Sequence, residues 1–123
     1  MILLDSNIII YSAIDQYKYL RELIKTSEVA CSIISKLEIL GYHKITAEQI
    51  NYFEAIFKVI DIKMISDEII NQAIKYRQKK SMSVGDSIIA ATSKIFQCDL
   101  YTNNMEDFIK IKDFKIINPL NRI

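Results

Sequence analysis

The chain has 123 residues, of which 50% are hydrophobic and 25% charged, and its formal net charge is +1. This length predicts one domain, residues 1–123, that can bury a hydrophobic core, and the composition excludes a disordered or fibrous protein. The nearly neutral charge also excludes a global basic field. A nucleic-acid partner would therefore have to be held by local patches.

The two cysteines, Cys31 and Cys98, lie in apolar stretches with no His or Cys nearby at metal-ligand spacing. They are predicted to be reduced, core-packed thiols, as in a cytosolic protein. The apolar start of the chain is broken at Asp5 without a basic leader, and no apolar segment approaches the ~18 residues that a membrane span requires. We therefore expect a soluble, cytoplasmic protein that does not bind membranes.

In the first half of the chain, short apolar runs alternate with helical patterns. Residues 2–4 and 29–31 read as buried strands, and helical spacing predicts helices over 8–11, 16–26 and 33–42. Ser6 or Asn7 is expected to cap the first helix. Thr46 and Gln49 have the spacing of a capping box, which predicts a helix beginning there and carrying an apolar stripe.

The second half continues the alternation. Strands are expected over 59–62, 99–102 and 115–117. Helices are expected over 66–80, from about Asp86 through an almost wholly apolar stretch, and over 104–111. In the helix over 66–80, the residues expected to face inward are Ile69, Ile70, Ala73 and Ile74. Strands that alternate with helices predict an α/β fold, a three-layer αβα sandwich with a mostly parallel, about five-stranded sheet. In such a fold the active site is expected outside the carboxyl ends of the strands.

Three acids stand where this topology can bring carboxylates together. Asp5 follows the first strand, Glu38 lies on the helix after the second, and Asp86 begins the buried helix before the fourth. With right-handed crossovers these side chains could converge at one edge of the sheet. Carboxylate oxygens are the ligands that Mg²⁺ prefers, so Asp5, Glu38 and Asp86 are our candidate metal ligands and catalytic residues.

Each acid also has a purely structural interpretation. Asp5 could cap the first helix, and Glu38 lies three residues after Ser35, which is again capping-box spacing. Asp86 could be a first-turn acid that the helix dipole favours. For each residue taken alone, the structural role is at least as common as the catalytic one.

The ordered set of motifs resembles the PIN-domain nucleases. The similar segments are Leu4-Asp5-Ser6-Asn7, Ser35-Lys36-Leu37-Glu38 with Gly41, Gly85-Asp86-Ser87-Ile88-Ile89-Ala90-Ala91-Thr92, and Leu100-Tyr101-Thr102-Asn103-Asn104 through Asp107-Phe108. The length also resembles that of the VapC-like toxins of bacterial toxin–antitoxin pairs. The resemblance implies a Mg²⁺- or Mn²⁺-dependent endoribonuclease that hydrolyses phosphodiester bonds in RNA. It further implies a small antitoxin partner and a homodimer.

The fourth motif departs from the family pattern. Family members often carry a further acid where this chain has Asn104, and Asp107 follows one helical turn later. Either residue could complete the metal site. Alternatively, Asn104 could only cap the short helix, and Asp107 could only pair with Lys110 or Lys112.

Other residues are expected to support the site. Ser6 and Asn7 would orient the neighbouring aspartate or a bound water, although helix capping explains them equally well. Arg77, Lys79 and Lys80 form the candidate RNA-binding patch, with a solvated helix end as the alternative.

Two other functions compete with the nuclease. A non-catalytic PIN-like RNA-binding module is favoured only by Asn104. A receiver-type phospho-signalling domain would require adjacent acids after the first strand, where this chain has Ser6 and Asn7.

Overall fold

The computed structural model describes residues 1–121, and its centre is a sheet of five parallel strands in the order β3-β2-β1-β4-β5. The strands are β1 (Ile2–Leu4), β2 (Val29–Ser32), β3 (Asp61–Lys63), β4 (Asp99–Tyr101) and β5 (Ile116–Ile117). The α-helices are α1 (Ser6–Ser12), α2 (Tyr19–Thr26), α3 (Ile33–Leu40), α4 (Ala47–Val59), α5 (Asp67–Lys79), α6 (Val84–Phe96) and α7 (Met105–Phe108). Every helix within residues 1–121 is too short or too polar to span a bilayer.

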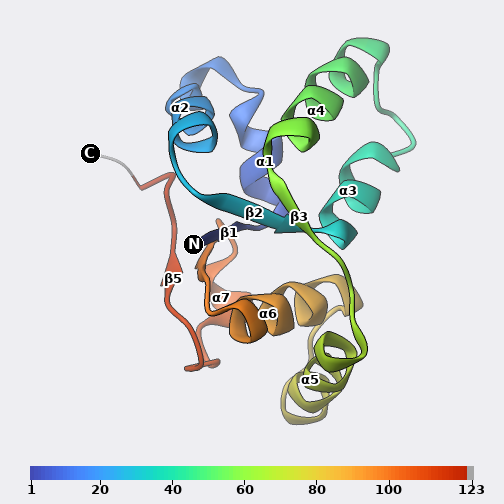
Figure 1. Cartoon of the computed structure of the whole chain (residues 1–123), viewed down its shortest axis with the longest axis vertical. Coiled ribbons are helices and arrows are strands. Elements are labelled where there is room, and N and C mark those ends of the chain that lie inside the picture. Colours follow the sequence, from blue (N-terminus) through green and yellow to red (C-terminus); the bar gives the residue numbers. More distant parts are fainter. Residues whose placement is uncertain (122–123) are drawn as a thin grey trace.

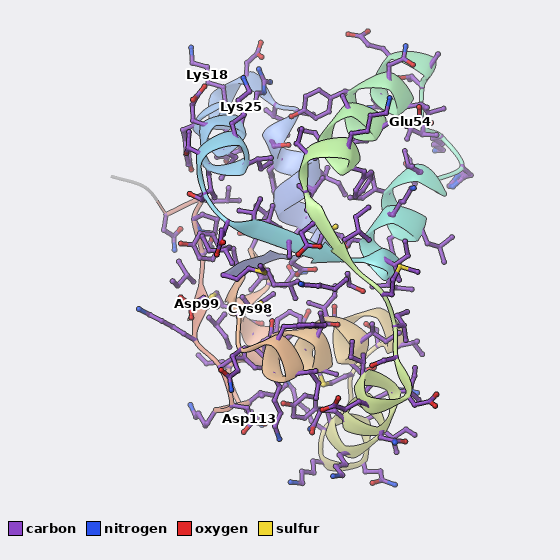
Figure 2. All side chains as sticks on the ribbon, viewed as in Figure 1. Lys18, Lys25, Glu54, Cys98, Asp99 and Asp113 are labelled. Carbon is purple, nitrogen blue, oxygen red and sulfur yellow. The ribbon has the colours of Figure 1, made fainter. Side chains whose placement is uncertain are left out.

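Helices cover both faces of this sheet, which confirms the predicted three-layer αβα sandwich (Figure 1). Successive strand residues point to opposite faces, so Leu3 and Leu4 belong to different cores. Leu3 packs in the cluster of α5 and α6, whereas Leu4 packs in the cluster of α1, α2 and α4. Side chains fill the space between each helical layer and the sheet (Figure 2).

Several element boundaries differ from the sequence prediction. The capping box of Thr46 and Gln49 is confirmed, but α4 continues to Val59, so β3 begins only at Asp61. The helix predicted over 16–26 is preceded by a separate 3₁₀ turn, η1 (Asp15–Tyr17), and α2 begins at Tyr19. The boundary between α4 and β3 is apolar on both sides, so periodicity alone does not locate it.

The inward face of α5 also differs from the prediction. Ile70 and Ile74 were expected to face inward, but they are 40% and 48% exposed. Instead, α5 buries Ile69, Ala73 and Tyr76, which have the i, i+4, i+7 spacing of one helix face. The abundance of isoleucine on both sides of α5 conceals this face in the sequence.

The strand order reverses beside β1. The strands β2 and β3 lie on one side of it, and β4 and β5 lie on the other. Open α/β sheets bind ligands in the crevice at the carboxyl ends of the strands that flank such a reversal. The receiver-type alternative is wrong, because that fold has the order β2-β1-β3-β4-β5.

Candidate active site

Asp5 is fixed at the carboxyl end of β1, beside the end of β4. The edge of the sheet at Asp5, together with Glu38, Asp86 and Asp107, whose charges act on one another, is called the acidic crevice. The Asp5 backbone N–H donates to the Tyr101 carbonyl of β4 at 2.9 Å, and its side chain is buried, with the residue 3% exposed. Oδ1 accepts from the Ser6 backbone N–H at 2.8 Å, and Oδ2 accepts from the Thr102 hydroxyl at 2.7 Å. Asp5 therefore caps α1 and is also held across the crevice by β4.

The expectation that Ser6 or Asn7 caps α1 is wrong, because the aspartate before them does so. Ser6 and Asn7 instead contact the elements on either side of Asp5. The Ser6 hydroxyl lies 2.8 Å from Oε1 of Glu38 and 2.8 Å from Oγ of Ser35. The Asn7 side-chain oxygen accepts from the Asn103 backbone N–H at 3.2 Å. Ser6 thus connects α1 to α3, and Asn7 connects α1 to the loop after β4.

Glu38 does not belong to a capping box, so that interpretation is wrong. The N-cap of α3 is Ser32, whose hydroxyl oxygen accepts from the Ile34 N–H at 3.1 Å. Ser35 lies inside the helix and is completely buried. Glu38 lies near the C-terminal end of α3, and its side chain is exposed rather than used to cap the helix.

Gly85 brings the start of α6 against Glu38. A Cβ atom on Gly85 would lie 2.8 Å from Oε2 of Glu38, closer than side chains normally approach. Because Gly85 has no side chain, the Glu38 carboxylate can pack against its backbone. This contact places Glu38 one residue away from Asp86.

Asp86 lies in the first turn of α6, which begins at Val84, earlier than predicted, and is capped by Ser83. Its backbone N–H donates to the Ser83 hydroxyl oxygen at 3.1 Å. Burial raises the pKa of the Asp86 carboxyl to about 6, and the charges of Asp5, Asp107 and Glu38 contribute in the same direction. Asp86 occupies a dipole-favoured position and also faces the other acids.

The pKa of Asp5 is raised as well, first by burial. Hydrogen bonds from Thr102 and Ser6 oppose this rise, and the charges of Glu38 and Asp107 add to it. Mutual repulsion therefore links all four acids, Asp5, Glu38, Asp86 and Asp107, at one edge of the sheet.

Asp107 and Asn104 play different parts in the fourth motif. Asn104 is the first residue outside α7, makes no side-chain cap, and donates its backbone N–H to the Thr102 hydroxyl oxygen at 2.9 Å. Asp107 is the residue whose charge acts on Asp5 and Asp86. No salt bridge among residues 1–121 includes Asp107.

The acids fit a hard divalent cation by their chemistry, because they offer carboxylate oxygens whose repulsion a cation would relieve. Within residues 1–121, however, no three Asp, Glu, His or Cys side chains are arranged as a ready-made metal-binding group. Hydrogen bonds hold Asp5 in place, whereas Glu38 is exposed and accepts a hydrogen bond from the Ser6 hydroxyl. Glu38 is therefore less constrained than Asp5 and has more freedom to move toward a cation.

The predicted basic patch of Arg77, Lys79 and Lys80 contains two residues that bond to backbone carbonyls and one that is exposed. Arg77 Nε donates to the Met82 carbonyl at 3.2 Å, and the Lys80 ammonium donates to the carbonyls of Glu106 and Asp107. Lys79 is exposed. Arg77 and Lys80 thus have structural contacts, and RNA binding by the patch stays a prediction.

Sequence reasoning missed Thr102, Ser35 and Gly85 as members of the site. Thr102 had the clearest signal, since it is a hydroxyl residue placed directly after a central strand. The contact between Ser35 and Ser6 depends on how α1 packs against α3. No local sequence pattern predicts this packing.

Next to Glu38, a groove of about 680 Å³ opens between α1, α3 and α4. Its lining includes Ile10, Ile14 and Tyr42, each of which is more than two-fifths exposed: 45%, 44% and 53%. The acidic crevice therefore adjoins an apolar groove.

Comparison with known proteins then assigns the family, because the PIN-domain profile matches residues 2–113. The chain belongs to the PIN-domain family. A toxin–antitoxin complex from Klebsiella pneumoniae contains a chain with 26% identity and a TM-score of 0.80, over 97% of this chain and 98% of that one. A comparison with curated proteins found no match.

Two further structures show the same PIN fold at lower identity. In VapBC2 from Rickettsia felis, bound to a DNA fragment from its promoter, the similar chain has 21% identity and a TM-score of 0.78, over 96% of this chain and 98% of that one. In FitAcB from Neisseria gonorrhoeae the similar chain has 21% identity and a TM-score of 0.79, over 99% of this chain and 100% of that one.

Proposed function

We propose that this PIN-domain protein is a metal-dependent endoribonuclease, and that it acts as the VapC-like toxin of a toxin–antitoxin pair. The observation that carries the proposal is that Glu38 contacts the neighbours of both aspartates at the edge where the strand order reverses: Ser6, next to Asp5, lies 2.8 Å from Oε1 of Glu38, and Gly85, next to Asp86, packs against Oε2. Family membership supports the nuclease, and the similarity to the Klebsiella pneumoniae toxin–antitoxin complex supports the toxin.

Asp5, Glu38 and Asp86 would hold Mg²⁺ or Mn²⁺, and Asp107 would supply the fourth acid in preference to Asn104. The bound cation would supply Lewis acidity and an activated water for in-line hydrolysis of an RNA phosphodiester. Asp107 is preferred because it carries a carboxylate whose charge already acts on Asp5 and Asp86.

The chain's own residues would do different work in this site. Asp5 would be the fixed member, since both of its oxygens accept hydrogen bonds. Glu38 would be the adjustable member, because it can leave the Ser6 hydroxyl. Before a cation binds, Asp86, with a pKa of about 6, would be partly protonated slightly below neutral pH, so cation binding would release this proton.

The proposed partners follow from the same similarity. A small antitoxin protein would cover the acidic edge, and two copies of the chain would form a homodimer in the cytoplasm. The Klebsiella pneumoniae structure is described as a toxin–antitoxin complex, which supports the antitoxin, and the Rickettsia felis VapBC2 structure is described as bound to a DNA fragment from its promoter.

Cleavage of a structured RNA by the purified protein tests the nuclease proposal. Wild type, Asp5→Asn, Asp86→Asn and the control Glu54→Gln would be assayed in chelator and then with Mg²⁺ or Mn²⁺. Glu54 is an exposed acid on α4 (Figure 2), away from the crevice. We expect cleavage only with a divalent cation, normal in Glu54→Gln and lost in the other two variants. Equal cleavage by all four proteins would contradict the proposal.

A second candidate is a PIN-like module that binds RNA without cutting it. The absence of a ready-made metal-binding group within residues 1–121 favours it. This candidate predicts that RNA binds equally well to wild type and Asp5→Asn, and that neither protein cleaves it with Mg²⁺ or Mn²⁺.

A further inference from the structure

The helix α7 is short, and it carries Asp107. It spans four residues, Met105–Phe108, and Asn104 before it provides no side-chain cap. The last carbonyls of any helix lack partners inside the helix, and in a helix of this length that applies to nearly every carbonyl. The position of Asp107 therefore depends on donors supplied by other parts of the chain.

Lys80 supplies such donors at the end of α7. Its ammonium donates to the Glu106 carbonyl at 3.1 Å and to the Asp107 carbonyl at 2.7 Å. Lys80 is the C-cap residue of α5, and it is partly buried. Since α5 packs against α6 in the core, this contact connects α7 to a rigid part of the fold.

The beginning of α7 is held from the opposite side. The Thr102 hydroxyl accepts from the Asn104 N–H at 2.9 Å and donates to Asp5 at 2.7 Å. The Asp107 N–H donates to the Asn104 carbonyl at 3.1 Å. The segment from Asn104 to Asp107 is thus fixed to the first acid at one end and to Lys80 at the other.

We propose that Lys80 is a positioning residue, which holds α7 so that the Asp107 carboxylate stays at the acidic crevice. Its ammonium is therefore committed to the protein and is not an RNA contact. The inference rests on the proposed function, because it gives Asp107 a place among the metal-binding acids.

Lys79 offers a matched control on the same helix end. It has the same charge and chain length and is exposed. If both lysines bound RNA phosphates, their loss would weaken RNA binding alike and reduce its salt dependence alike. If Lys80 positions α7, only its loss would change α7 and the cation site.

The experiment compares wild type, Lys80→Met, Lys80→Arg and Lys79→Met without RNA. Hydrogen exchange of the amides over 105–111 reports on α7, and Mn²⁺ affinity, measured by electron paramagnetic resonance, reports on the acids. In Lys80→Met we expect faster exchange and weaker Mn²⁺ binding, each on the order of tenfold, as for loss of a charge-assisted hydrogen bond. Lys80→Arg should restore both in part, and Lys79→Met should match wild type.

The inference is overturned if Lys80→Met exchanges and binds Mn²⁺ like wild type, or if Lys79→Met changes both as much. Lys80→Gln, which is too short to reach both carbonyls, is a second variant should Lys80→Met fold poorly, and the same results are expected. Wild type that binds no Mn²⁺ would contradict the proposed function instead. In that case the exchange measurement alone decides whether Lys80 holds α7.

Discussion

Asp86→Asn is predicted to make the cation-free protein more stable while abolishing its proposed activity. Burial and the neighbouring acids raise the pKa of Asp86 from its ordinary 3.8 to about 6. Between these values the folded state holds a proton that the unfolded state has lost, so stability falls as pH rises through this range. Above pH 6 the whole penalty is present, and asparagine, which has a similar shape and no charge, removes it.

The size of the gain follows from the shift. Each pKa unit corresponds to about 1.36 kcal/mol, so the rise from 3.8 to about 6 sets an upper bound of roughly 3 kcal/mol. Asp86 is only partly buried, and solvent screening reduces this bound. We expect about 1–2 kcal/mol in Asp86→Asn, or a melting temperature higher by about 4–8 °C.

The assay is thermal unfolding in chelator at pH values from 4 to 7.5, with wild type, Asp86→Asn and Glu54→Gln. The advantage of Asp86→Asn should be complete at pH 7.5 and should shrink toward zero at pH 4. Glu54→Gln, which changes an exposed acid on α4, should follow wild type throughout (Figure 2). An Asp86→Asn protein that is no more stable than wild type at pH 7.5 would refute the electrostatic reasoning.

Three further predictions concern Gly85, Thr102 and Cys31. In Gly85→Ala the new Cβ would lie 2.8 Å from Oε2 of Glu38 and displace that carboxylate. RNA cleavage should fall on the order of tenfold, since small misplacements of site residues are costly, with the melting temperature almost unchanged; wild-type kcat/KM would be evidence against this contact. Thr102→Val removes the hydroxyl donor to Oδ2 of Asp5 and should destabilise the protein by about 1–3 kcal/mol in chemical denaturation. It should also raise the pKa of Asp5 further, so that the acidic limb of the pH–rate profile moves to higher pH; an unmoved limb would argue against the Thr102 contact. Burial raises the pKa of the Cys31 thiol to about 12, so Cys31 should resist iodoacetamide at pH 8 until denaturant is added, and rapid labelling of the native protein would contradict its burial.

Much of the fold follows from local patterns. The central strands are short apolar runs that end at polar residues, and β1 has the bounds that the sequence predicts. The prediction was less accurate where apolar residues continue through a boundary, as between α4 and β3, or occupy both faces of a helix. The choice of Ile69 over Ile70 as a core residue is made by packing against α6.

The site was predictable to the extent that it depends on residue type and strand order. Asp5, Glu38 and Asp86 could be selected because carboxylates at strand ends suit a cation. The partners that fix these acids could not be predicted, since the contact between Ser6 and Glu38 and that between Thr102 and Asp5 join segments far apart in sequence. The local capping-box pattern at Glu38 was misleading, because the end of β2 places the true cap at Ser32.

The central claim is that the carboxylates at the crevice form a metal centre that cleaves RNA. The most direct measurement adds Mg²⁺ stepwise to chelator-treated wild type and Asp5→Asn and follows single-turnover cleavage of one structured RNA. The account predicts a rate that rises with Mg²⁺ and saturates in wild type, and no cleavage by Asp5→Asn at any concentration. Cleavage by wild type without a divalent cation, or equal rates in both proteins, would contradict it.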